Sequence, residues 1–212
     1  MSSTDPFTKI INQILEGVVK TFNSEIGPAI HDAGYDPYKN VSSGSSSIGV
    51  GSVSYSITDL AGLSSFEIED LVTSEIESRG SSLVGKLAYH AKLNESLSTK
   101  VGGKLKILFA HPGISGSIRI SDATVSGSAS VIATVEGSKV CITDISNLSA
   151  DFNYGSANIW INDLGPLNYL LKPLESLILD VAKSSIRSLV SGEVESIVSS
   201  QLKDQLPQCA SL

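Results

Sequence analysis

The chain has 212 residues, of which 41% are hydrophobic and 17% charged, and its formal net charge is −7. This length suffices for one large domain with a buried core. The acidic balance argues against a nucleic-acid partner, because contact with phosphates requires clustered lysine and arginine. No apolar run approaches the ~20 residues that a membrane-spanning helix requires.

The first predicted element is an amphipathic helix over residues 5–26. Thr4 or Asp5 caps its start, and Gly27-Pro28 ends it. Apolar residues recur every three or four positions along one broad face. They are Ile10, Ile11, Ile14, Leu15, Val18, Val19 and Phe22.

Over residues 43–161 apolar side chains recur at every second position, which predicts roughly six to eight antiparallel strands. The many serines predict strands whose solvent face carries hydroxyl groups more than charges. The apolar parity flips between Val50 and Val53, so Gly51-Ser52 is a predicted β-bulge.

Within this region, the turn Arg79-Gly80 predicts a hairpin with a charged outer face. Its first strand alternates apolar residues, Val72 among them, with glutamates, and Asp70 is an exception on the apolar side. Cross-strand pairs of opposite charge are expected to set the register. They would join Glu67, Glu69, Glu75 and Glu77 to Lys86, His90 and Lys92.

Residues 166–206 predict one long amphipathic helix, because apolar residues recur every three or four positions. Pro166 suits its first turn, and Pro207 ends it. Pro173 predicts either a kink or the true start of the helix. From Pro173 to Leu206 the helix spans roughly 50 Å at ~1.5 Å per residue.

This order of elements predicts an α+β fold in one tubular domain over residues 1–212. A helix of that length needs an elongated partner, and a strongly curled antiparallel sheet supplies one by wrapping around it lengthwise. The shorter N-terminal helix then lies beside the long helix inside the roll. Frequent glycines and bulges suit a sheet that bends in this way.

Two features favour secretion, although no signal segment precedes the first helix. Sequons predict glycosylation at Asn40, Asn94 and Asn147. The two cysteines, Cys141 and Cys209, form either one disulfide, which pins the tail to a strand, or two free thiols.

Three stretches of the chain follow one another in an informative order. The first helix descends into the segment YDPYK at 35–39, a Gly-Leu turn separates two strands within 57–66, and LGPL at 164–167 leads into the long helix. Together they resemble the tubular lipid-binding (BPI-like) superfamily, and most of all the arthropod group-7 mite allergens and the takeout and juvenile-hormone-binding proteins.

The resemblance implies a half-length member with one roll, which acts outside the cell. It implies binding of lipids or other apolar ligands between sheet and helices, without catalysis, and it extends to allergen-like or innate-immunity roles. The sequence departs from the family in two respects: it lacks the N-terminal disulfide of takeout-like proteins, and Cys141 and Cys209 match no family pattern.

The chain lacks motifs for catalysis. Glu67, Glu69 and Asp70 could bind Ca²⁺, but alternation places Asp70 opposite the two glutamates, which favours a solvated face paired with lysines. Ser115 misses the spacing of a nucleophile elbow. His31, His90 and His111 are isolated, with no second ligand at helical spacing. We therefore expect no enzyme, no metal ion and no cofactor.

A core of small aliphatic side chains with only 6% aromatics is hard to fill in an elongated roll, which predicts an apolar cavity. Its predicted wall is Ile14, Val18 and Phe22 from the first helix, Phe109 and Trp160 from the sheet, and Leu170, Leu174, Leu177, Ile178 and Val181 from the last helix.

Three functional hypotheses follow. The first is a secreted carrier or sensor of a lipid, expected as a monomer or weak dimer. The second is a surface-active protein of the same fold, whose helices open at an air–water, membrane or microbial surface. The third is a relative without any ligand, whose apolar stripes are only core.

Overall fold

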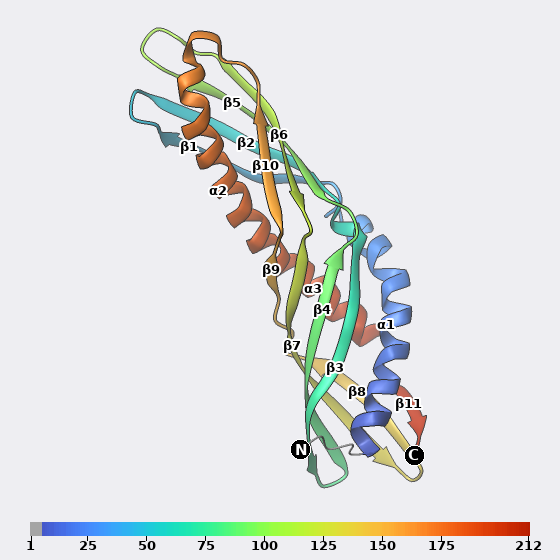
Figure 1. Ribbon diagram of the computed structural model, residues 1–212. Helices are drawn as coiled ribbons and strands as arrows, with labels where there is room; N and C mark the ends of the chain where they lie inside the picture. The colour runs from blue at the N-terminus through green and yellow to red at the C-terminus, as the bar shows by residue number, and fades with distance from the viewer. Residues whose placement is uncertain (1–5) are drawn as a thin grey trace.

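The computed structural model describes residues 6–212, which form an elongated rod (Figure 1). Its strands form two antiparallel sheets placed end to end, which we call the upper and the lower sheet after their places in Figure 1. In order across the upper sheet lie β1 (Tyr38–Ser47), β2 (Ser52–Ala61), β5 (Leu97–Lys106), β6 (Gly113–Ser121) and β10 (Ser156–Ile161). Across the lower sheet lie β11 (Gln208–Ser211), β8 (Lys139–Ser146), β7 (Thr124–Glu136), β4 (Ser82–Leu93) and β3 (Phe66–Arg79), and β9 (Asp151–Asn153) pairs with β7.

Each sheet curls around a different helix. Both edge strands of the upper sheet, β1 and β10, contact α2 (Leu171–Leu189), while both edge strands of the lower sheet, β3 and β11, contact α1 (Pro6–Asp32). The predicted α+β fold, with a curled antiparallel sheet, a long C-terminal helix and an N-terminal helix, is confirmed. Its strands are divided between two curled sheets instead of forming one.

The C-terminal helix continues through both halves of the rod. After a 3-10 turn, η2 (Gly165–Leu170), it passes through α2, a π-helical stretch η3 (Val190–Val194) and α3 (Glu195–Asp204). Because the α-helix begins at Leu171, Pro173 lies in its first turn, where backbone N–H groups have no helical partner. The predicted helix start near Pro173 is confirmed. The helix ends at Asp204, before the predicted residue 206.

The N-terminal helix is longer than predicted. It continues through Pro28 to Asp32, whereas its predicted caps Thr4 and Asp5 lie outside the described residues. A proline inside a helix costs ~3 kcal/mol. Burial of Ile26 and Ile30, both 0% exposed, offsets that cost at about 1.5–3 kcal/mol each.

Two expectations for the first strands are wrong. β1 begins at Tyr38, before the predicted residue 43, and Gly51-Ser52 is no bulge. The chain reverses there in a hairpin turn, in which the Ile48 N–H donates to the Gly51 carbonyl at 3.0 Å. Gly49 takes the positive φ of 79° that such a turn requires, so the change in parity reflects a change of strand.

The predicted charged hairpin is confirmed, but the buried and exposed positions of its first strand differ in part from those predicted. β3 pairs with β4 so that Glu69 binds Lys92 at 2.7 Å and His90 at 3.1 Å, and Glu75 faces Lys86. The register shifts between Ile68 and Asp70, which explains the exception at Asp70. Beyond the shift Val72 is 47% exposed, so its predicted place on the buried face is wrong.

Two asparagines attach α1 to the edge strand β3. The Asn23 side chain donates to the Ile68 carbonyl at 2.8 Å and accepts from the Ile68 N–H at 2.9 Å. Asn12, three turns earlier, accepts from the Thr73 N–H at 2.9 Å. Both contacts lie at register shifts of β3, so the helix binds backbone groups near points where the strand ladder is interrupted.

The two halves meet at a buried carboxylate. Asp36, 8% exposed, accepts from the backbone N–H of Gly62 at 3.0 Å and of Ser64 at 2.6 Å. Gly27 lies against the same turn, where an added Cβ would stand 2.7 Å from the Ser64 carbonyl oxygen. The YDPYK segment and the Gly-Leu turn of the sequence are therefore one contact in space.

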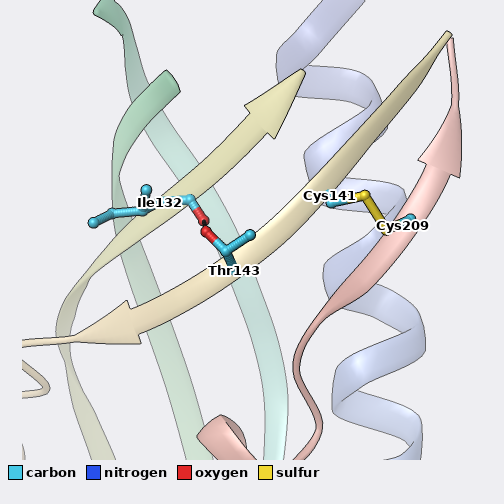
Figure 2. The surroundings of a disulfide bond; sticks show 4 residues. All are labelled: Ile132, Cys141, Thr143 and Cys209. Carbon is cyan, nitrogen blue, oxygen red and sulfur yellow. Dashed lines mark hydrogen bonds between the residues drawn. A yellow bond between two sulfur atoms is a disulfide. The ribbon is translucent and has the colours of Figure 1, made fainter. Parts of the chain in front are cut away.

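A disulfide joins Cys141 on β8 to Cys209 on β11, which lie directly opposite each other (Figure 2). In the same view, the Thr143 hydroxyl donates to the Ile132 carbonyl on β7 at 3.3 Å. The bridge attaches the segment that follows the C-terminal helix to the lower sheet.

Candidate functional site

The residues predicted to line one ligand site are distributed over both halves of the rod. Three lie on the buried face of α1 in the lower half: Ile14, Val18 and Phe22. Five lie on η2 and α2 in the upper half, where Leu170, Leu174 and Ile178 are buried and Leu177 and Val181 are half-buried. The structure therefore does not bring the two helical groups together.

The two aromatic residues predicted from the sheet point away from the interior. Phe109 is 98% exposed, in the turn between β5 and β6, and Trp160 is 62% exposed on β10. Side chains alternate between the two faces of a strand, and Ile159 and Ile161 point inward, so Trp160 between them points outward. Their predicted positions on an interior wall are wrong.

An apolar cavity does lie in the lower half, between the concave face of the sheet and η3. Its volume of about 10 Å³ is about what one water molecule occupies. Phe22 reaches this region through Phe66, with the two rings packed edge to face at 6.4 Å. The lining consists of Phe66, Tyr89, Val125, Leu148, Ala150, Val190, Val194, Glu195 and Val198.

A polar groove of about 530 Å³ adjoins this cavity on the outside. Leu148 and Glu195 belong to both linings, so they form the wall between groove and interior. The remaining groove residues are Asn147, Gly192, Ser196, Ser199, Ser200 and Lys203. Hydroxyl groups and one lysine thus face solvent directly outside an apolar space.

Residues 147–150, which carry Leu148, form a segment without helix or strand. One backbone hydrogen bond, from the Ser149 N–H to the Ser128 carbonyl at 2.9 Å, attaches them to β7. Side chains hold them as well: the Tyr89 hydroxyl donates to the Ser149 carbonyl at 2.6 Å, and the Ser191 hydroxyl donates to the Ala150 carbonyl at 3.2 Å. Burial raises the pKa of the Tyr89 hydroxyl well above its ordinary value, and the nearby charge of Glu195 adds to this effect. Tyr89 therefore remains a neutral donor.

The opposite side of the groove is the π-helical stretch. A π-bulge widens one helical turn and occurs frequently at functional sites. Here it contributes Val190 and Val194 to the cavity and Gly192 to the groove. Glu193 in the same stretch accepts from the Tyr35 hydroxyl at 2.7 Å, which raises the pKa of Tyr35 and ties the bulge to the junction between the halves.

Sequence reasoning missed the segment 147–150 and the π-helical valines. One signal for them was available, because Gly192 interrupts the predicted helix and an isolated glycine there often has a packing or functional reason. The π-helical turn itself leaves no mark in the apolar period.

No protein-family model matches this chain, and no curated protein sequence matches it. Among solved structures, the chain is similar to a lipopolysaccharide binding protein, at 15% identity and a TM-score of 0.39. That similarity covers 86% of this chain and 40% of the other, so the chain spans less than half of that protein. It is also similar to Takeout 1 of Epiphyas postvittana, at 9% identity and a TM-score of 0.36, over 88% and 87% of the two chains.

Other predicted sites can be placed on the structure. Asn40, Asn94 and Asn147 are all exposed, and Asn147 stands at the groove. Among residues 6–212, no group of three histidine, cysteine, aspartate or glutamate side chains is arranged to hold a metal ion. No helix in this part of the chain is both long and apolar enough to cross a membrane.

Proposed function

We propose that the protein is a secreted, non-enzymatic binding protein for lipids or other apolar small molecules, which it holds between the helices and the curled sheet. The observation that carries this proposal is the wall shared by the polar groove and the apolar cavity of the lower half. An amphiphile fits such an arrangement, with its polar head among the serine hydroxyls and Lys203 and its apolar tail behind Leu148.

Ligand binding requires this cavity to widen, since about 10 Å³ does not hold an alkyl chain. Leu148 is the side chain whose movement joins cavity and groove. It lies on a segment outside any strand, which one backbone hydrogen bond and several side-chain hydrogen bonds hold, next to a π-bulge. Local opening is expected where regular backbone pairing is absent.

Displacement of a fluorescent fatty acid by unlabelled lipids tests the proposal, with a matched pair of variants. Ala150 and Ala157 are both half-buried, but Ala150 lines the cavity and Ala157 lies on β10 in the upper half. We expect Ala150→Leu to weaken binding about tenfold by filling the cavity, and Ala157→Leu to leave it unchanged. If no lipid displaces the probe from the unmodified protein, the proposal is wrong.

Secretion is the second part of the proposal. It is supported by the Cys141–Cys209 bridge, because disulfides persist in oxidising compartments, and by the exposure of the three sequons. Expression in a secreting eukaryotic host, followed by glycopeptide mapping, tests this part. Unmodified asparagines at all three positions would contradict it.

A second candidate function is that of an interfacial protein. It is favoured by the exposed apolar side chains of the upper half, among them Leu108 and Phe109. Surface-tension measurements at micromolar protein test it, and an unchanged surface tension would exclude activity at an air–water interface.

A further inference from the structure

Two hairpin turns lie side by side at the far end of the upper half (Figure 1). One joins β1 to β2 and carries Val50. The other joins β5 to β6, and its central residues are Leu108 and Phe109, since Ile107 and Ala110 exchange hydrogen bonds of 3.0 and 2.6 Å. The turns pack closely: a Cβ added at Gly51 would stand 2.2 Å from the Lys106 carbonyl oxygen.

These turns present apolar side chains to solvent. Val50 is 54% exposed, Leu108 84% and Phe109 98%, and we call these three residues the apolar end. A two-residue hairpin turn whose first central residue has positive φ strongly favours glycine at that position, and asparagine tolerates it better than other residues with side chains. Here Leu108 takes a φ of 36° instead. Leucine is disfavoured at a positive φ, and here its side chain is not buried in return. Such a residue indicates a functional requirement.

Further exposed aromatic residues belong to the same half. Trp160 is 62% exposed on β10, and Tyr169 is 64% exposed on η2. The chain between them passes beside the start of β6, where Asn162 accepts from the Ser115 N–H at 2.7 Å. Tryptophan and tyrosine are enriched at the level of lipid headgroups, where their rings have both an apolar and a wet side.

The charge around the apolar end is positive, although the whole chain carries −7. Residues 96–121 contain Lys100, Lys104, Lys106 and Arg119 and no aspartate or glutamate. Lys100 pairs with Asp59 at 2.9 Å, whereas Lys104 and Lys106 form no ion pair within the part of the chain that the structure describes. Acidic residues of the same half include Asp163 before η2, whose carboxylate accepts from the Gly165 N–H, and Glu175 on α2.

We propose that the apolar end docks this protein on an anionic phospholipid bilayer. Leu108 and Phe109 insert among the lipid chains, and Lys104 and Lys106 lie against headgroup phosphates. An apolar insertion combined with basic residues supplies the two signals that stable peripheral binding requires. No opening of the helices is needed, because these side chains are already exposed. The inference deepens the interfacial candidate and is independent of the ligand proposal.

Co-sedimentation with vesicles of phosphatidylcholine, with and without phosphatidylglycerol, tests the proposal. We expect binding to the vesicles that contain phosphatidylglycerol and at least about tenfold weaker binding by the double variant Leu108→Asn, Phe109→Gly. Asparagine tolerates the positive φ at position 108 better than leucine does, and Phe109 is 98% exposed, so the thermal midpoint should be kept or raised. Loss of vesicle binding in a variant that folds at least as well separates a membrane role from a structural one.

Val72→Ser is the matched control, since Val72 is 47% exposed on β3 in the lower half, and we expect it to bind vesicles normally. Replacing Lys104 and Lys106 by glutamine should weaken binding about fivefold per lysine and reduce its dependence on salt. Ala150→Leu should leave vesicle binding unchanged.

Three outcomes would overturn the proposal. The first is equal binding to both kinds of vesicle, and the second is normal binding by the Leu108→Asn, Phe109→Gly variant. The third is the absence of vesicle binding in the unmodified protein, together with a dimer that the double variant abolishes. That result would assign the apolar end to a second copy of the chain.

Discussion

The two halves of the rod share an architecture and differ in charge. Strands of the upper sheet carry five basic residues and one acidic residue, a formal charge of +4, whereas those of the lower sheet carry four basic and eight acidic residues, a formal charge of −4. The upper sheet curls around one helix, while the lower sheet packs against α1 and α3 and is closed by a disulfide.

This difference fits the two roles that we propose. The lower half combines an internal cavity, an adjoining groove and firm attachment of its edge strands, which suits the enclosure of a ligand. The upper half exposes apolar side chains beside a basic surface, which suits contact with an anionic surface. Under these two proposals, a similar curled sheet would serve two purposes, because different side chains occupy its outer face and its turns.

Removal of the disulfide should weaken the lower half most. We expect Cys141→Ser with Cys209→Ser to reduce the free energy of unfolding by about 2–4 kcal/mol, because the bridge closes a loop of 68 residues. Urea denaturation measures the loss. Hydrogen exchange compares the two halves of the rod. We expect faster exchange in β8 and β11 but not in the upper sheet. Equally faster exchange in both sheets would contradict a local effect on the lower half.

Asp36→Ala should disturb the junction between the halves. The variant leaves the N–H groups of Gly62 and Ser64 without their acceptor, which costs about 3 kcal/mol. Thermal denaturation measures the change, with Asp32→Ala as the control because that carboxylate is 83% exposed. Asp36→Asn retains one acceptor oxygen and should lie between the two, and equal stability of all three variants would refute this role.

The smallest effect concerns acid pH. Lys100 and Lys39 hold the pKa of Asp59 in the upper half below its ordinary value, and Lys92 does the same for Glu69 in the lower half, with His90 adding to it. Because both pKa values are lower in the folded state, the contribution to stability is present above the unfolded pKa of about 4 and is lost as the pH falls through the folded value.

Glu69 is exposed and Asp59 half-buried at the surface, so salt should screen much of this small contribution. Urea midpoints of Asp59→Asn and Glu69→Gln between neutral and acid pH measure it. We expect each variant to show a flatter pH dependence at low salt and little difference at high salt. A steeper dependence in either variant would contradict the assignment.

The sequence predicted the elements well where a single period dominates. The period of 3.6 placed both helices, and the cross-strand charges identified the β3–β4 hairpin. The sequence-based prediction failed where the burial of side chains in the tertiary structure outweighs local signals such as a proline or an alternating pattern. Pro28 does not end α1 because Ile26 and Ile30 are buried on either side of it, and the register shift near Asp70 reversed the parity of Val72.

The candidate site was harder to predict than the fold. Apolar spacing identifies Phe22, Leu174 and Phe109 equally as candidates for the interior, although only the first two are buried. The spacing of apolar residues shows which face of a strand or helix they share. It does not show which other element packs against that face. The segment 147–150 and the π-bulge have no period at all, so the groove could not be found this way.

By itself, the sequence determined the order and type of the elements, the charged hairpin and the acidic balance, because these depend on neighbours a few residues apart. Tertiary structure decided that the strands divide into two sheets, that Asp36 meets Gly62 across the junction, and that Leu108 and Phe109 remain in solvent. Those outcomes depend on contacts between residues far apart in the chain, whose energies arise only when the backbone has brought them together.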